Sequence, residues 1–397
     1  MIRSAPRSTL RSGVALLGAA AVIGAASPAH AVLCSTLANP VYITGGGKVA
    51  IADLAKALSS SGISLVYKLQ GSCLAVDAIL NGTHVGTAAD TVAAYWDSST
   101  EQKCDLDPMG QVADLGLSDV FPSTCQSLPG GLPSNVGDFF GPVEAYTFVV
   151  PKTSTQKVIS KAAGYFVFGF GKDSGVEPWT DESFLFIRDA SSGTQQMFGA
   201  AIGVPPLKWH GVSATSSGDL VTKIIASTKP EATIGILTAE VAGANRATLT
   251  TLAYQDVDQS CGYWTDSTPS GFDKRNVRDG HYAVWGPLHL LTKLDGNGYP
   301  INKSAGDVVA YLTGTKTAPG GFDLIALLAG AHIIPACAMQ VRRMSELGPL
   351  TSFAPEQACG CYFDEVATGS TKCKVCMSDV ECGEGAPKCN YGYCETQ

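Results

Sequence analysis

Residues 184–202 read FLFIRDASSGTQQMFGAAI, and the rest of the chain can be organised outward from this stretch. Its apolar start predicts a strand that ends at Arg188, and the run from Gln195 onward predicts a helix. Ser192 stands at the N-cap position, where its side chain and the free N–H groups after it point toward one small volume. The guanidinium of Arg188, the positive helix start and the hydroxyls of Ser192 and Thr194 favour an anion in that volume. An ordinary capped helix, with Arg188 in a surface salt bridge, is the alternative interpretation.

The first 31 residues have the composition of a secretory signal peptide. Three arginines precede an apolar run over residues 13–24, and the segment that ends at Ala31 is typical of a cleavage site. We therefore expect cleavage after Ala31 and export to the periplasm or cell surface. The apolar run is shorter than the ~20 residues that a membrane helix needs, so no transmembrane anchor is expected. Leu33 is too bulky for a lipoprotein signal, which favours an unlipidated Cys34 and a soluble mature protein.

Charge and composition narrow the classes of partner. Loss of the three signal arginines takes the formal net charge from −8 to −11, so we expect no nucleic-acid or anionic-membrane partner. An anion site in such an acidic chain must depend on local donors. The remaining residues can fill two or three domains, and 45% apolar residues with 44 glycines are typical of an α/β core.

All 13 cysteines follow residue 31, and export makes disulfides their expected state. Because the number is odd, at least one thiol should be free or intermolecular. We interpret residues 81–109 as an inserted surface loop tied by a Cys104–Cys125 disulfide. The concentration of cysteines after residue 356 indicates a separate tail. Its Cys373-x-x-Cys376 spacing also occurs in zinc sites, but export favours disulfides, and we expect no metal site.

The strand, turn and helix unit occurs twice more before residue 100. Residues 41–44 predict a strand, and Gly45-Gly46-Gly47 then leads into a helix; a tight turn without function is the alternative. The turn is not a nucleotide P-loop, because Lys48 is followed by Val49 and not by Ser or Thr. Residues 63–67 predict another strand, and Ser72 precedes a second helix.

A short strand within residues 112–121 delivers Asp119 at its C-terminal end, the edge where ligands collect in open α/β sheets. A helix cap or turn residue is the alternative for this aspartate. The β-rich run 144–150 predicts a crossing into a second lobe, and Ser154 is expected to cap a helix through Val158, Ile159 and Ala163. Strands alternating with helices predict an α/β fold with mixed sheets flanked by helices.

No catalytic motif is recognisable. The chain has no His-Glu-x-x-His helix, no Gly-x-Ser-x-Gly elbow and no Ser-x-x-Lys beside a plausible partner. None of the mature histidines stands beside a candidate nucleophile or a regularly spaced metal ligand. We therefore expect no catalytic residues, no cofactor and no enzymatic activity; a phosphate-ester hydrolase is the least favoured alternative.

Three motifs together resemble the periplasmic phosphate-binding protein of the phosphate ABC transporter, a type II periplasmic binding protein. They are Tyr67-x-x-x-Gly71-Ser72, Asp114-Leu115-Gly116-Leu117-Ser118-Asp119 and Arg188-x-x-x-Ser192-Gly193-Thr194, in the order and spacing of that family. The strand 233–237 is similar to the one by which the family returns to its first lobe. The resemblance implies a two-lobed fold that closes on phosphate in an interlobe cleft, and an ABC transporter permease as partner.

The resemblance also implies roles and boundaries. By position, Ser72, Arg188, Ser192, Gly193 and Thr194 would donate to the anion, and Asp119 would accept the phosphate proton. Sulfate carries no proton at neutral pH, so Asp119 would reject it. We expect lobe 1 to comprise residues 32–147 and 248–355 and lobe 2 residues 148–247; the disulfide-rich tail, which the cysteine distribution marks, comprises residues 356–397.

The chain departs from the family at four places, one of which is Cys73 beside Ser72. Lys48 and Val49 stand where the family has a hydroxyl residue and an aromatic, so backbone N–H groups at Gly47, Lys48 and Val49 are expected to serve instead. The insertion before Asp119 and the cysteine tail are also outside the family pattern. The alternative function is therefore a binding-protein fold repurposed as a cell-surface interaction protein through its tail.

Overall fold

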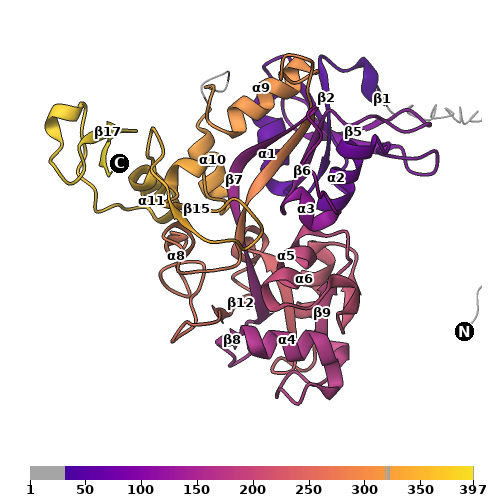
Figure 1. The fold of residues 1–397 in the computed structure, drawn as a ribbon, viewed down its shortest axis with the longest axis vertical. Helices are drawn as coiled ribbons and strands as arrows, with labels where there is room; N and C mark the ends of the chain where they lie inside the picture. The colour runs from indigo at the N-terminus through magenta and orange to yellow at the C-terminus, as the bar shows by residue number, and fades with distance from the viewer. Residues whose placement is uncertain (1–31, 318, 320–321, 397) are drawn as a thin grey trace, which may run out of the picture. The chain divides into compact units, whose positions relative to one another are not determined.

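A twelve-stranded mixed sheet forms the centre of the computed structural model, which describes residues 32–396 except 318, 320 and 321 (Figure 1). The predicted signal peptide lies outside the described residues. The first half of the sheet has, in order, β1 (Val32–Leu33), β5 (Glu101–Asp105), β4 (Val92–Trp96), β3 (Ser64–Tyr67), β2 (Pro40–Gly45), β6 (Leu115–Ser118), β14 (Trp285–Lys293) and β7 (Val136–Pro151). The second half continues from β7 through β11 (Ile234–Thr238), β9 (Leu185–Arg188) and β10 (Val212–Ala214), with β12 (Leu249–Thr251) also paired to β7.

The 16-residue strand β7 joins the two halves. Residues 136–145 pair antiparallel with β14, whereas residues 146–149 pair antiparallel with β11. Figure 1 shows β7 running from the elements around β2 and β6 to those around β9 and β12. A shared strand of this kind lets the halves turn about it while the sheet stays continuous.

Helices cover both faces of each half. In the first half these are α1 (Lys48–Leu58), α2 (Ser72–Asn81), α3 (Pro122–Cys125), α9 (Lys303–Leu312) and α10 (Leu324–Gly330). The second half has α4 (Lys161–Phe170), α5 (Gly193–Ile202), α6 (Ser217–Ile225), α7 (Ala239–Ala244) and α8 (Arg275–Arg278). Short 3₁₀ turns occur at Cys34–Thr36, Gly171–Asp173, Glu182–Phe184, Pro206–Lys208, Ala336–Ala338 and Asp379–Glu381.

The core follows the strand alternation of the sequence. Val41 and Ile43 on β2 are buried with the apolar faces of α1 and α9, whereas Tyr42 packs into the separate cluster that contains α2. A third and larger cluster fills the second half and includes α5 and β11. The predicted α/β fold, with mixed sheet halves flanked by helices and a cysteine-rich tail, is confirmed; the lobe and tail boundaries stay predictions.

The predicted surface loop over residues 81–109 is wrong, because it contains β4 and β5. Strand β5 lies near the edge of the sheet, and within its sequence EQKCD only Cys104 is buried. Only the two-residue β1 flanks β5 on its outer side, so β5 needs no apolar run. Strand β4 reads VAAYW, an apolar run that the loop interpretation overlooked. The helix predicted from Ser154 is also wrong: residues Val158–Ser160 form β8, which pairs with β13 (Ala253–Gln255), and Ser160 caps α4 by accepting from Ala163 N at 3.1 Å.

The cysteines form six disulfides in the described part of the chain, and Cys261 is an exposed free thiol, as the odd number requires. The pairs are Cys34–Cys104, Cys73–Cys125, Cys337–Cys359, Cys361–Cys373, Cys376–Cys389 and Cys382–Cys394. The predicted Cys104–Cys125 bridge is wrong, because β1 pairs with β5 and thereby places Cys34 beside Cys104.

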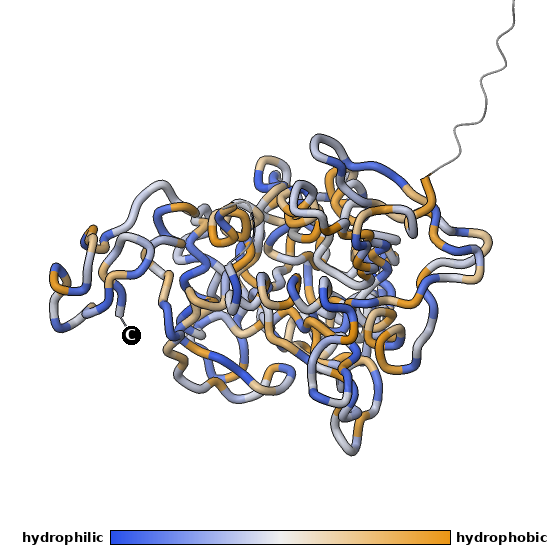
Figure 2. The backbone as a smooth tube through the Cα atoms, turned by 90° about the horizontal axis from the view of Figure 1, so that it is seen from above, coloured by the Kyte–Doolittle hydropathy of each residue, from blue (hydrophilic) through white to orange (hydrophobic). Residues whose placement is uncertain are grey.

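The tail begins inside the main core. Its helix α11 (Gly360–Thr368) buries Phe363 completely in the cluster of the second half. Beyond it, the tail contains the 3₁₀ turn at Asp379–Glu381, the small hairpin of β17 (Lys388–Asn390) and β18 (Tyr393–Glu395), and three disulfides. A further two-stranded pair, β15 (Val341–Arg342) and β16 (Thr351–Ser352), precedes α11. In Figure 2 much of the tail is hydrophilic, whereas apolar stretches recur throughout the body. Across the residues that the structure describes, no helix is both long and apolar enough to span a membrane.

Candidate functional site

Asp119 lies at the centre of the site, directly after β6. A Cβ atom added to Gly46, in the turn after β2, would come within 2.4 Å of Asp119 Oδ1, and one added to Gly193 would come within 2.6 Å of Oδ2. Neither glycine therefore has room for a side chain. The carboxyl group of Asp119 is held between the turn that leads into α1 and the first residue of α5.

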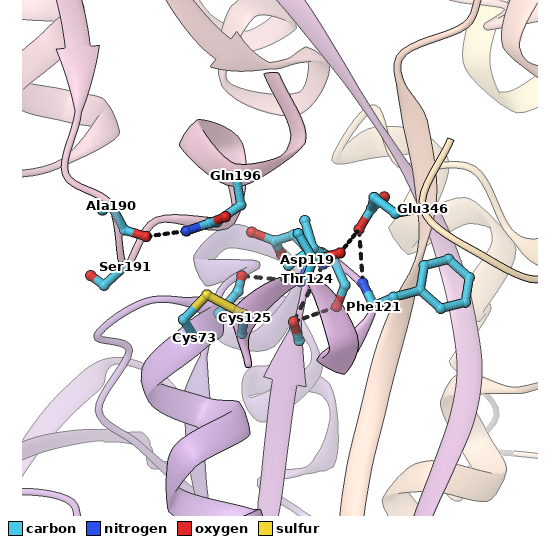
Figure 3. The surroundings of a disulfide bond; sticks show 12 residues. Cys73, Asp119, Phe121, Thr124, Cys125, Ala190, Ser191, Gln196 and Glu346 are labelled. Carbon is cyan, nitrogen blue, oxygen red and sulfur yellow. Dashed lines mark hydrogen bonds between the residues drawn. A yellow bond between two sulfur atoms is a disulfide. The ribbon is translucent and has the colours of Figure 1, made fainter. Parts of the chain in front are cut away.

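The start of α2 meets the start of α5 at the same point. Ser72 is completely buried, and its Oγ accepts a hydrogen bond from Asp119 N at 3.1 Å. A Cβ on Gly193 would lie 2.2 Å from that Oγ atom. Cys73 N also donates to Ser191 O at 3.2 Å, which links α2 of the first half to the β9–α5 loop of the second. Figure 3 shows Cys73 and Ser191 facing each other beside Asp119.

The β9–α5 loop has the predicted helix start. Ser192 is the N-cap residue of α5, and Ser192, Gly193 and Thr194 are all buried. Within the described chain the Ser192 side chain makes no capping hydrogen bond, so the predicted position is right but its hydroxyl does not satisfy the helix start. Gly193, the first residue of the helix, lies against Asp119 and Ser72.

Arg188 is half-buried at the end of β9. Its Nε donates to Ala214 O at 3.3 Å and its Nη1 to Ser217 Oγ at 2.9 Å, so the start of α6 orients the guanidinium. No ion pair to Arg188 occurs among the residues in the described ranges, which disfavours the surface salt bridge of the alternative interpretation. Burial lowers the pKa of Arg188, while Asp189, Asp119 and Asp219 raise it.

Lys48 and Val49 are the first two residues of α1, and Gly47 is its N-cap with φ 70°. The left-handed backbone at Gly47 turns the chain into the helix at no steric cost. The backbone of all three predicted residues thus belongs to a helix start beside Asp119. Three helix starts (α1, α2 and α5), each predicted from sequence, converge there.

Burial raises the pKa of Asp119 to about 6. The hydrogen bond from Ser72 and the positive charges of Arg188 and His289 oppose this rise. Tyr146 on β7 donates its hydroxyl to Asp119 O at 3.0 Å and so fixes the backbone of the residue. Asp119 is therefore a rigidly held acceptor whose carboxyl responds to charge in the site.

Glu144, on β7, was not predicted as a site residue. It is 3% exposed, and its carboxyl interacts with the carboxyl of Asp119. A Cβ on Gly47 would lie 3.5 Å from Glu144 Oε1, so the side chain reaches the start of α1. Burial raises its pKa well above the ordinary value, and the charges of Asp119 and Glu240 raise it further. The only sequence signal is one acid within the apolar run PVEAYTFVV.

Glu346 is a second residue that the sequence did not reveal. Its carboxylate accepts from Phe121 N at 2.9 Å and from Thr124 Oγ1 at 3.0 Å, and thereby satisfies the start of α3. The Cys73–Cys125 disulfide joins the other end of α3 to α2 (Figure 3). The segment that carries Asp119 is thus fixed on both sides, by contacts up to 225 residues apart in sequence.

No protein-family profile matches this chain, and no curated protein matches it in sequence. Among solved structures it is similar to a Clostridium perfringens protein assigned as a phosphate ABC transporter substrate-binding protein with bound phosphate (12% identity, 75% of this chain and 99% of that chain, TM-score 0.48). It is also similar to an ABC-type phosphate transport receptor from Vibrio cholerae (14%, 75% and 99%, 0.46) and to PstS from Borrelia burgdorferi (12%, 75% and 98%, 0.40). With values this low, the likeness is one of fold alone.

Proposed function

We propose that this chain is an exported binding protein for a small protonated oxyanion, with inorganic phosphate as the first candidate. One observation carries the proposal: the buried carboxyl of Asp119 lies where the starts of α1, α2 and α5 converge. Helix starts provide free N–H groups and a positive field, and Arg188 adds a cation whose charge acts on Asp119. Such a set of donors favours an anion of few atoms that touches all of them at once.

The acceptor at the centre selects for a proton on that anion. Hydrogen phosphate can donate its hydrogen to Asp119 while its other oxygens accept from the helix starts. Sulfate has no hydrogen at neutral pH and would place a lone pair against the carboxylate, which costs free energy in a buried site.

Binding in this place requires movement of the two halves. Asp119 and Ser72 of the first half lie directly against Gly193 of the second, so an anion must separate them before it can contact both. Strand β7 pairs with both halves and is the natural hinge. We infer that the anion and the closed arrangement stabilise each other, as in a ligand-shifted two-state equilibrium.

Isothermal titration of the mature protein with phosphate, arsenate and sulfate tests this function. We expect heat of binding with phosphate and with arsenate, which also carries a proton, and at least about tenfold weaker binding of sulfate. Absence of heat with phosphate, or equal affinity for sulfate, contradicts the proposal.

Export after Ala31 and delivery of the anion to an ABC transporter permease belong to the same proposal. The alternative, a surface-interaction protein acting through the tail, has less support. The tail borders a groove of about 1160 Å³ lined in part by Arg275, Gln340 and Lys374, but the described residues give no indication of a partner's chemistry.

A further inference from the structure

We propose that Glu144 is a specificity-determining residue of the anion site, whose protonated carboxyl donates a hydrogen bond to the bound anion from the α1 side. The inference rests on the oxyanion-binding function proposed above and assigns a second acid to that site. Asp119 then accepts the hydrogen of the anion, and Glu144 donates its own.

The geometry places Glu144 at the site, beside the carboxyl of Asp119. Its side chain reaches the Gly47 turn, 3.5 Å from where a Cβ on that glycine would lie. Both oxygens are buried, and the carboxyl of Glu144 interacts with that of Asp119, an interaction that favours the proton on Glu144 and the charge on Asp119. Two buried acids in contact disfavour each other's ionisation, and such pairs in native proteins are commonly functional.

The α1 side of the site lacks a hydroxyl donor. Residues 45–50 read GGGKVA, so the turn and the first helical residues offer no Ser or Thr side chain. On the opposite side, by contrast, the start of α5 has the hydroxyls of Ser192 and Thr194. A protonated carboxyl is an O–H donor, and Glu144 is the buried side chain that reaches this gap.

The charged groups around the two acids explain which of them keeps the proton. Asp119 at the end of β6 and Glu240 on α7 are the charges that act on Glu144, and both disfavour its ionisation. Arg188 on β9 and His289 on β14 instead favour the ionised form of Asp119. Tyr146, two residues after Glu144 on β7, donates its hydroxyl to Asp119 O.

Two further groups complete these surroundings. His289 Nδ1 lies 2.9 Å from both carboxylate oxygens of Asp138, and the carboxylate of Glu346 accepts from the start of α3. Neither group is placed to neutralise Glu144. An ionised Glu144 would therefore add a second fixed negative charge beside an anion, whereas a neutral one adds a donor.

Substitution of Glu144 distinguishes a donor from a repelling charge. Glu144→Gln keeps the shape but replaces the acid O–H by a weaker amide donor, so phosphate affinity at pH 7 should fall by about three- to tenfold. Glu144→Ala removes the donor and should weaken binding by about tenfold or more beyond Glu144→Gln. The matched control is Glu356→Gln, an exposed residue far from these contacts, which should bind like the wild type.

Infrared spectra of the phosphate-saturated wild-type protein supply a test that does not depend on how well a variant folds. They should contain a protonated-carboxyl band at pH 7 that the Glu144→Gln spectrum lacks. Tighter phosphate binding by Glu144→Gln, wild-type affinity in Glu144→Ala, or absence of that band overturns the role of Glu144 while leaving phosphate binding in place. If the wild type itself binds neither phosphate nor arsenate, the proposed function fails, and the role of Glu144 fails with it.

Discussion

The two sides of the candidate site differ in chemistry and in how they are held. The side formed by β6, β7 and α2 presents two buried acids, Asp119 and Glu144, and is secured by the Cys73–Cys125 disulfide. The side formed by β9 and α5 presents Arg188 and a hydroxyl-rich helix start, and residues 126–260 contain no cysteine. A cation and a helix start, such as Arg188 and the start of α5, attract many kinds of anion. Buried acids repel every anion that cannot share a hydrogen with them. Under the proposed function, the donor side would provide affinity and the acid side would provide selectivity.

The donor side is tested most strongly by Arg188→Ala. Loss of a half-buried cation whose charge acts on Asp119 should weaken phosphate binding by roughly 2–5 kcal/mol, as for one member of a desolvated charge pair. Titration calorimetry measures the loss, and Arg275→Ala, which removes an exposed arginine on α8, should change nothing. If Arg188→Ala bound phosphate with wild-type affinity, the guanidinium of Arg188 would not contribute to anion binding.

The rigidity of the acid side is tested by replacing both Cys73 and Cys125 with serine. The closed loop spans 52 residues, so the free energy of unfolding should fall by about 2–4 kcal/mol. Denaturant titration measures this change, with Cys261→Ser as a control because its thiol is free and exposed. If the free energy of unfolding fell no more than in the control, the Cys73–Cys125 disulfide would not stabilise α2 and α3.

The contact between the two sides is tested by Gly193→Ala. The new Cβ would lie 2.2 Å from Ser72 Oγ and 2.6 Å from Asp119 Oδ2, in the space between these groups that the proposed anion must enter, so it should cost binding about 1–3 kcal/mol. Phosphate affinity should fall accordingly. Gly296→Ala is the matched control, because a Cβ there meets nothing within 4 Å. Equal affinities of the two variants would show that the sides do not meet at Gly193 when ligand is bound.

Selectivity should respond to the acid side alone. In Asp119→Asn the side-chain amide can donate to an unprotonated oxygen, so the preference for phosphate over sulfate should fall by about tenfold, or about 1.4 kcal/mol. Competition titrations of both anions on the variant and on Arg188→Ala measure this ratio. The ratio should change little in Arg188→Ala, where both anions lose the same cation; an unchanged ratio in Asp119→Asn contradicts the acceptor role.

Features of the site that depend on local sequence could be predicted, whereas those that depend on distant contacts could not. Glycine turns and helical periodicity were sufficient to predict the starts of α1, α2 and α5, because those signals are local. Glu144 was missed because a single acid inside a buried strand has the same local pattern as a solvent-facing residue. Glu346 was missed because its contact with Phe121 depends on the folding of distant segments. Strand β5 was missed because a polar edge strand has no apolar pattern to detect.

A crystal structure with arsenate tests the central proposal most directly, since arsenic can be located by its anomalous scattering. We predict one strong anomalous peak between Ser72 Oγ, the Asp119 carboxyl and the N–H of Gly193, within hydrogen-bond distance of each. A peak elsewhere, such as in the groove beside the tail, with none between these three groups, would contradict it.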